Sequence, residues 1–166
     1  MPHHNRSKHP RAGIQDVVHA ARITIGAVAS ILIARLCRLP EAYWAAIATL
    51  IALQSTFGAA WAVSRQRFIG TAMGAATGAL LSMYAGRNLV VFGLGVFVLG
   101  LVCAVLRVDR GAYHYAGITL VIVMLIVYNR GPWSVALHRF VEISVGLAVG
   151  LVLTALWPEP NPTTSN

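Results

Sequence analysis

Four long stretches of the chain contain no Asp, Glu, Lys or Arg, and they constrain the fold more than any other feature. They cover residues 42–64, 68–86, 88–106 and 111–129. A helix that crosses a bilayer needs about 20 mostly apolar residues, and each stretch is about that long. The four stretches therefore predict four membrane-spanning helices.

Two further apolar segments predict a first and a last span, at roughly 17–36 and 133–157. Charged or titratable residues interrupt both segments: Arg22 in the first, and His138, Arg139 and Glu142 in the second. Short breaks rich in Arg, Gly, Pro and Asn separate the six segments, at residues 35–40, 64–67, 86–88, 107–111 and 129–132. The sequence thus predicts an all-α integral membrane protein with six transmembrane helices.

The composition excludes an ordinary water-soluble domain and a disordered chain. Hydrophobic residue types make up 57% of the chain and charged types 11%, and the mean hydropathy is +0.69. A soluble domain carries about 25% charged residues. The net charge of +8 comes from basic residues that stand singly or in pairs, with no stripe of Lys and Arg among aromatics. We therefore expect a lipid bilayer as partner and no nucleic acid.

The spans divide the chain into a basic cytoplasmic tail (1–16), a transmembrane domain (17–158) and a short C-terminal tail (159–166). Cytoplasmic loops carry an excess of Lys and Arg, which sets the orientation. With the N-terminus inside, the cytoplasmic side holds Arg6, Lys8, Arg11, Arg65, Arg67, Arg107 and Arg110. The other side holds Arg35, Arg38, Arg87 and Arg130. This bias predicts that both termini are cytoplasmic.

Two segments of the sequence match each other at a constant offset. The first segment contains Arg67-Phe68, Gly74 and Gly78, and the second contains Arg139-Phe140, Gly146 and Gly150. A looser match, at nearly the same offset, pairs Tyr43, Ala46 and Thr49-Leu50 with Tyr113, Ala116 and Thr119-Leu120. Three spans per half would make two inverted repeats, an arrangement that recurs in secondary transporters. The alternative is that glycine at every fourth place is merely common in membrane helices.

Glycines at intervals of four form two ridges, Gly70, Gly74 and Gly78 in one segment and Gly146 and Gly150 in the other. Because glycine has no side chain, two helix backbones can approach closely at such a ridge. Helix packing is the interpretation that we favour. The alternative is a substrate or pore wall lined by backbone.

Charged side chains within the apolar spans are candidates for ligand binding, since each costs on the order of 3 kcal/mol to insert. Arg139 and Glu142 stand three residues apart on one helix face and are able to pair. Arg22 is near a span end, from which its side chain can reach the headgroups. The functional hypothesis is that Arg22, Arg67 and Arg139 face a water-filled cavity and bind an organic anion, because guanidinium matches a carboxylate bidentately.

Two further polar features extend this hypothesis. His138 lies beside Arg139 and Glu142, so that His138 and Glu142 are candidates for a proton path. Gln54 opens a polar stretch, residues 54–58, within the charge-free run. This stretch is either an unwound passage that offers amide and backbone groups to a ligand or the place where the helix ends.

No arrangement of residues in the sequence is typical of an enzyme. There is no nucleophile elbow and no Gly-rich phosphate loop, and the five acidic residues are scattered. The two cysteines, Cys37 and Cys103, lack the spacing of a metal site. We therefore expect no catalysis, no cofactor and no metal.

Several short motifs in order resemble the fusaric acid resistance protein-like family. They are the first helix with Arg22, the segments 39–46 (LPEAYWAA), 53–58 (LQSTFG) and 67–78 (RFIGTAMGAATG), and the last helix with Arg139-Phe140 and Leu156-Trp157-Pro158. The resemblance covers about residues 17–158. This family includes the aromatic acid exporters and is distantly similar to plant aluminium-activated malate transporters. The resemblance implies a six-helix module of the bacterial inner membrane that exports organic, often aromatic, acids.

The size of the chain departs from the larger members of that family. Those members resemble two such modules joined with a cytoplasmic region, or one module followed by a soluble domain. A single module therefore leads us to expect a homodimer or a higher oligomer. Two alternatives remain open at this point, namely a non-transporting membrane scaffold or regulatory subunit, and an anion channel.

Overall fold

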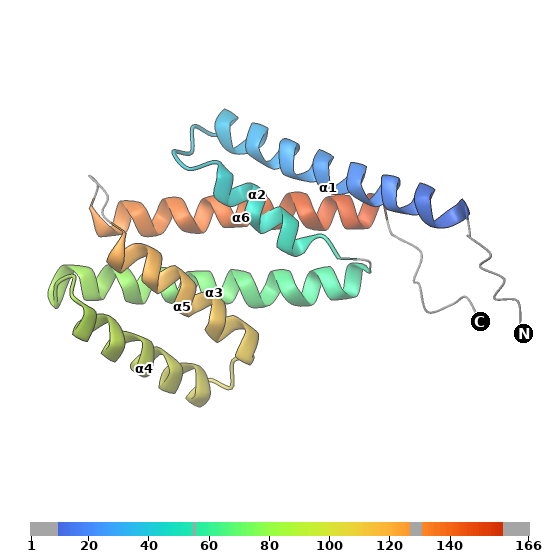
Figure 1. The fold of residues 1–166 in the computed structure, drawn as a ribbon. Helices are drawn as coiled ribbons and strands as arrows, with labels where there is room; N and C mark the ends of the chain where they lie inside the picture. Colours follow the sequence, from blue (N-terminus) through green and yellow to red (C-terminus); the bar gives the residue numbers. More distant parts are fainter. Residues whose placement is uncertain (1–9, 55, 127–130, 158–166) are drawn as a thin grey trace, which may run out of the picture.

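The apolar runs of the chain fold into α-helices, as the sequence predicts. The computed structural model describes residues 10–54, 56–126 and 131–157, and every regular element in these ranges is a helix. The helices are α1 (Pro10–Leu36), α2 (Tyr43–Ala52), α3 (Phe57–Tyr84), α4 (Leu89–Val105), α5 (Arg110–Leu125) and α6 (Pro132–Leu156) (Figure 1).

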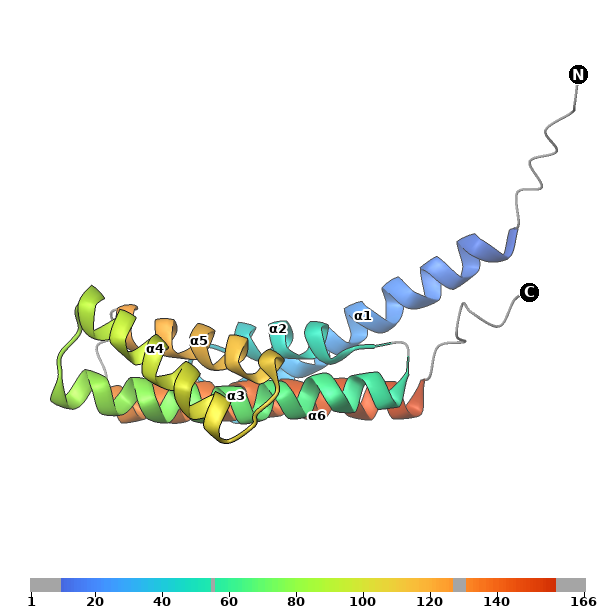
Figure 2. The same cartoon turned by 90° about the horizontal axis from the view of Figure 1, so that it is seen from below.

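Two long helices, α3 and α6, form the centre of the bundle and run side by side in opposite directions (Figure 1). Figure 2 shows α3 and α6 in one layer, with the shorter α2 and α5 lying over them. The contacts follow a matched scheme, in which α2 packs on α6 while α5 packs on α3. In the same way α1 contacts α2 and α6, and α4 contacts α5 and α3. The two halves of the chain therefore use equivalent pairs of helices.

The helices pack through small residues, which allows close contact between their backbones. A Cβ atom added at Gly74 would meet the backbone of Ala116, and one added at Gly146 would meet the carbonyl oxygen of Ala45. Gly70, Gly78 and Gly150 lie at the same two helix contacts. Both glycine ridges are thus the surfaces on which α3 receives α5 and α6 receives α2.

The region between α2 and α3 differs from the prediction. The apolar run 42–64 is not one helix, because α2 ends at Ala52 and Leu53 is extended (φ −68°, ψ 101°). Thr56 then caps α3, and its Oγ1 accepts a hydrogen bond from the backbone N–H of Ala59 (3.3 Å). Threonine is a favoured N-cap residue because its oxygen satisfies a free N–H of the first turn. A local polar cap therefore overrides the continuous apolar pattern.

The predicted turn at 64–67 is wrong, since these residues lie inside α3. Gln and Arg are good helix formers and nothing in this segment breaks a helix. Arg65 and Arg67 are therefore helix residues and not loop residues. Because Arg67 is also buried, it no longer counts among the basic residues that predict the cytoplasmic side. The turn at 129–132 and most of the two tails, at 1–9 and 158–166, lie outside the described residues, whereas 10–16 belong to α1.

Two segments of the described helices are long and apolar enough to cross a membrane, Asp16–Leu36 and Pro132–Leu156. They match the predicted first and sixth spans. The other apolar helices found by the same criteria, α2 and α4, are shorter. The full count of six spans remains a prediction.

Candidate functional site

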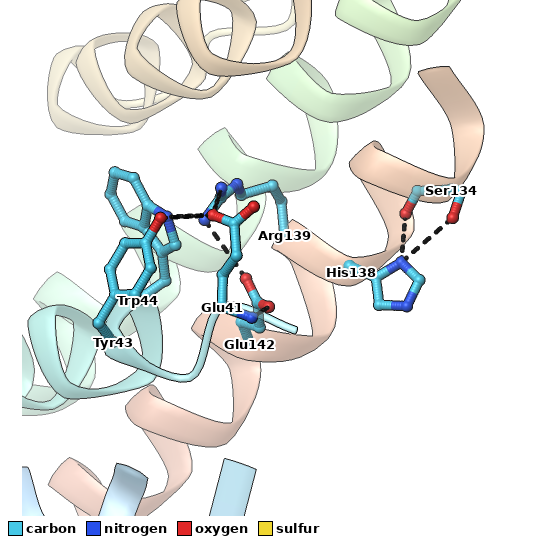
Figure 3. A network of polar contacts seen from close by, with 7 residues as sticks. All are labelled: Glu41, Tyr43, Trp44, Ser134, His138, Arg139 and Glu142. Carbon is cyan, nitrogen blue, oxygen red and sulfur yellow. Dashed lines mark hydrogen bonds and ion pairs between the residues drawn. The ribbon is translucent and has the colours of Figure 1, made fainter. Parts of the chain in front are cut away.

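Arg139 of α6 is buried among groups from the start of α2 (Figure 3). Its guanidinium forms ion pairs with Glu41 and with Glu142, the second at 3.3 Å. Its guanidinium carbon also lies 4.4 Å from the centroid of the Trp44 ring, in a cation–π contact. Arg139 is 1% exposed and Glu142 is 1% exposed, so that this pair lies fully inside the protein. The predicted pairing of Arg139 with Glu142 is therefore present, and a second carboxylate joins it.

Glu41 is the member of this cluster that the sequence analysis missed. Its Oε2 accepts hydrogen bonds from the Tyr43 hydroxyl (2.6 Å), the Trp44 indole N–H (3.1 Å) and Arg139. Its backbone N–H donates to Glu142 Oε1 (2.9 Å). Glu41 lies in the turn that follows α1, and a charge in a predicted turn gives no reason to suspect a site. The available signal was the acid next to two aromatic residues, Tyr43 and Trp44.

His138 is turned away from this cluster in Figure 3. The hydrogen bonds of its Nδ1 go to Ser134, one turn earlier on α6, at 2.6 Å from the carbonyl oxygen and 3.4 Å from the hydroxyl. Among the described residues, this nitrogen thus forms no hydrogen bond with Glu142. The proton path through both residues stays a prediction.

Arg67 of α3 occupies a different environment. It is 5% exposed, and its guanidinium carbon lies 5.2 Å from the centroid of the Tyr115 ring on α5. Within the described part of the chain no carboxylate pairs with Arg67, and its Nε has no hydrogen-bond partner. The Oγ of Ser64, one turn earlier on the same helix, is likewise buried without a partner there. Two buried polar groups on adjacent turns are therefore left unsatisfied by the described residues.

The two arginines correspond to each other in the sequence match, and their aromatic neighbours meet. The rings of Phe68 and Phe140 lie 4.9 Å apart between centroids, where α3 passes α6. Each arginine also stacks on an aromatic ring of the overlying short helix. The acids differ between the halves, because glycines, Gly70 and Gly111, stand at the positions that match Glu142 and Glu41. At these two matched positions Arg139 thus has acids, and Arg67 has glycines instead.

Arg22 of α1 belongs to a third set of contacts. It is buried, and its Nη2 donates to the backbone carbonyl oxygen of Gln54 (2.8 Å) and to Thr154 Oγ1 (2.9 Å). The Gln54 side chain itself donates to the carbonyl oxygen of Ile51 (3.0 Å), within its own segment. Arg22 therefore ties α1 to the connection after α2 and to the end of α6. The polar stretch at 54–58 is where one helix ends and the next begins, although residue 55 lies outside the described residues.

A groove of about 310 Å³ runs along the contact of α3 with α6, close to Arg67. Aromatic and aliphatic side chains form most of its wall, and Ser64 is one of its few polar residues, with its Oγ atom buried. The lining residues are Trp61, Ser64, Arg65, Phe68, Ser144, Leu147, Ala148 and Leu151. Arg65 at this groove forms an exposed ion pair with Asp109 (3.0 Å). A mostly apolar groove with a few polar groups is typical of small-molecule sites.

The described residues contain no group of three His, Cys, Asp or Glu that is able to hold a metal ion. Cys37 is exposed and Cys103 is buried, and both are free. The sites described above present guanidinium, carboxylate, hydroxyl and aromatic groups. Of these, the guanidinium and hydroxyl groups donate hydrogen bonds to anions.

The described residues form an all-helical fold, and two of its helices contain segments long and apolar enough to cross a membrane. The chain belongs to the fusaric acid resistance protein-like family, whose model matches residues 28–153. This family makes the protein one related to membrane transport. Comparison with curated proteins and with solved structures gives no significant match.

Proposed function

We propose that the protein is a transporter that exports organic, in particular aromatic, acids, and that Arg67 holds the carboxylate of the substrate. The observation that carries this proposal is the buried Arg67 guanidinium without a carboxylate partner among the described residues. A buried charge without a counter-charge is expensive. A bound organic anion supplies the missing negative charge beside Arg67, as Glu41 and Glu142 supply it beside Arg139.

The surroundings of Arg67 support an aromatic substrate. Ser64 lines the groove and lies three residues before Arg67 on α3, so the arginine is one helical turn from the groove wall. The groove offers Trp61 and Phe68 to an aromatic ring. A substrate with its ring in the groove and its carboxylate toward Ser64 and Arg67 satisfies both unpartnered groups.

We also propose that six spans form two inverted three-helix repeats in the bacterial inner membrane, with both termini cytoplasmic. The opposite directions of α3 and α6, the contact of Phe68 with Phe140, and the equivalent helix contacts of the two halves support the repeat. Gly and Ala at these contacts let the halves pack closely. We expect the active form to be a homodimer or a higher oligomer, acting without enzymatic activity, cofactor or metal.

Glu142 remains the proposed proton-carrying residue. Glu41 and Glu142 both pair with the single guanidinium of Arg139, so the three groups carry a net negative charge when both acids are ionised. One added proton balances the charges of this buried cluster. Proton uptake there is a route for coupling export to a proton gradient.

The test is the survival of cells, with and without the protein, across a panel of aromatic acids. Arg67→Gln is expected to abolish any resistance that the protein confers, while Arg67→Lys restores little because lysine lacks the planar fork. Arg35→Gln, which removes an exposed arginine from the last turn of α1, is the control and is expected to behave as wild type.

Wild-type resistance in Arg67→Gln, at equal abundance in the membrane, would rule out Arg67 as the carboxylate site. Equal survival with and without the protein on every acid would instead favour the non-transporting scaffold. Passive currents of small anions in reconstituted vesicles would favour the channel.

A further inference from the structure

Three hydrogen-bond donors converge on one oxygen of Glu41. The Tyr43 hydroxyl, the Trp44 indole N–H and the Arg139 guanidinium all donate to Glu41 Oε2 (Figure 3). We infer that these three side chains form a second carboxylate-binding site, that Glu41 occupies it as an internal ligand, and that a small external carboxylate can replace Glu41 there. This inference concerns the cluster of side chains around Arg139 and does not require that the protein transports anything.

Arg139, the charged donor of this set, is more buried than the acid that it binds. Arg139 is almost fully buried within α6, whereas the Glu41 side chain is 20% exposed and lies in the turn before α2. Hydrogen bonds from charged donors to a carboxylate are short and strong, so this donor set favours any carboxylate that reaches it. The Glu41 side chain is therefore the part of the cluster that reaches the surface of the protein.

Departure of the Glu41 carboxylate leaves Arg139 with a counter-charge. Glu142 keeps its ion pair with Arg139 and its hydrogen bond from the Glu41 backbone N–H, so the turn stays attached. Breaking a buried ion pair is costly only when one charge is left alone. Two carboxylates around one cation therefore make the outer one exchangeable. In the internal sequence match, the position that corresponds to Glu41 is occupied by a glycine, Gly111, which offers no carboxylate.

The site can be tested by removing the internal ligand and supplying a free one. Glu41→Ala opens space for a carboxylate of the size of acetate, and it is expected to lower the Tm of the purified protein in detergent. Sodium acetate is then expected to raise this Tm saturably, by roughly 5 °C, whereas sodium chloride at equal ionic strength does not. In the wild type the same acetate is expected to change the Tm by much less, because Glu41 competes for the donors.

Asp109→Ala is the matched control, because it removes a carboxylate that pairs with an arginine on the exposed surface. It is expected to show no response to acetate. Adding Trp44→Phe to Glu41→Ala removes one donor and is expected to raise the half-saturating acetate concentration about tenfold. Adding Arg67→Gln is expected to leave the response intact, which separates this site from the proposed transport site.

Equal acetate responses in Asp109→Ala and Glu41→Ala would overturn the inference, and so would an unchanged midpoint after Trp44→Phe. If Glu41→Ala yields no folded protein, Glu41→Gln takes its place, since its amide is a weaker, uncharged competitor for the donors. Acetate is then expected to stabilise Glu41→Gln more than the wild type. Equal stabilisation of the two proteins would overturn the inference.

Discussion

Arg67 and Arg139 are the same residue type at matched positions, yet their neighbours give them different electrostatics. Arg139 has two carboxylates and an indole ring around it, whereas Arg67 has a tyrosine ring and no acid among the described residues. The free energy of a buried charge depends on such partners more than on burial itself. Identical substitutions at the two positions should therefore have opposite consequences.

Arg139→Gln is expected to lower the free energy of unfolding by about 3–5 kcal/mol, because it leaves the two acids without their shared cation. Arg67→Gln is expected to leave stability unchanged or to raise it, since it removes a buried charge that lacks a counter-charge among the described residues. Titration of both variants with a denaturing detergent, followed by circular dichroism, measures the difference. Equal losses in the two variants would contradict this account of the electrostatics.

The role of Arg139 in export is a separate matter from its role in stability. If the guanidinium only neutralises acids, the double variant Arg139→Gln/Glu142→Gln still binds the substrate, because a buried pair is often dispensable when both partners are removed. If Arg139 also contacts the substrate, the single and the double variant both lose substrate binding while still inserting into the membrane. The ion pair of Arg139 with Glu142 leads us to expect the first result, measured as substrate binding to the purified protein in detergent.

At the scale of helices, the bundle depends on two backbone-to-backbone contacts, α3 with α5 and α6 with α2. Glycine at these contacts replaces a side chain with space for a neighbouring carbonyl group. The described helices contain other glycines with open space around them. The position of a glycine in the bundle therefore decides whether it is needed for close helix packing.

Gly74→Ala is expected to destabilise the protein by about 1–3 kcal/mol, as overpacking does, because the new methyl group would meet the backbone of Ala116. Gly117→Ala on α5 is the control, since nothing lies within 4 Å of a Cβ atom there. It is expected to be neutral or to stabilise the helix by up to about 1 kcal/mol. The measurement is again the free energy of unfolding in detergent, and similar effects of the two changes would refute the close contact.

At the scale of the whole molecule, α1 begins and α6 ends at the same end of the bundle (Figure 1). The turns after α1 and α3 lie toward the opposite end, whereas α4 and α5 meet below the middle of α3. This arrangement agrees with an even number of crossings, and α1 and α6 contain the segments that are long and apolar enough to cross a membrane.

Reporters fused to the two termini are therefore expected to lie on the same side of the membrane. A reporter that is active only outside the cytoplasm should give no signal from either terminus, while its insertion beside Arg38 or Arg87 should give a strong one. Both of these arginines lie in turns at the far end. A strong signal from the C-terminal fusion would overturn the proposed orientation and the inverted repeat with it.

The sequence by itself determined the helical class, the family and the first and last apolar spans. These follow from hydrophobicity and residue order, which are local properties of the chain. The sequence left two interpretations open for residues 54–58, an unwound passage or the end of a helix, and the structure shows that α2 ends just before this stretch and that Thr56 caps α3 within it.

Only the tertiary structure decided which charges are compensated. The Glu41 carboxylate pairs with Arg139 across 98 positions, and the Glu41 backbone N–H donates to the Glu142 carboxylate across 101. No local pattern records such contacts. The two arginines look alike in the sequence, and their difference arises when folding brings acids to one of them and none of the described acids to the other. Electrostatic energy depends on distance in space, which the order of residues alone does not contain.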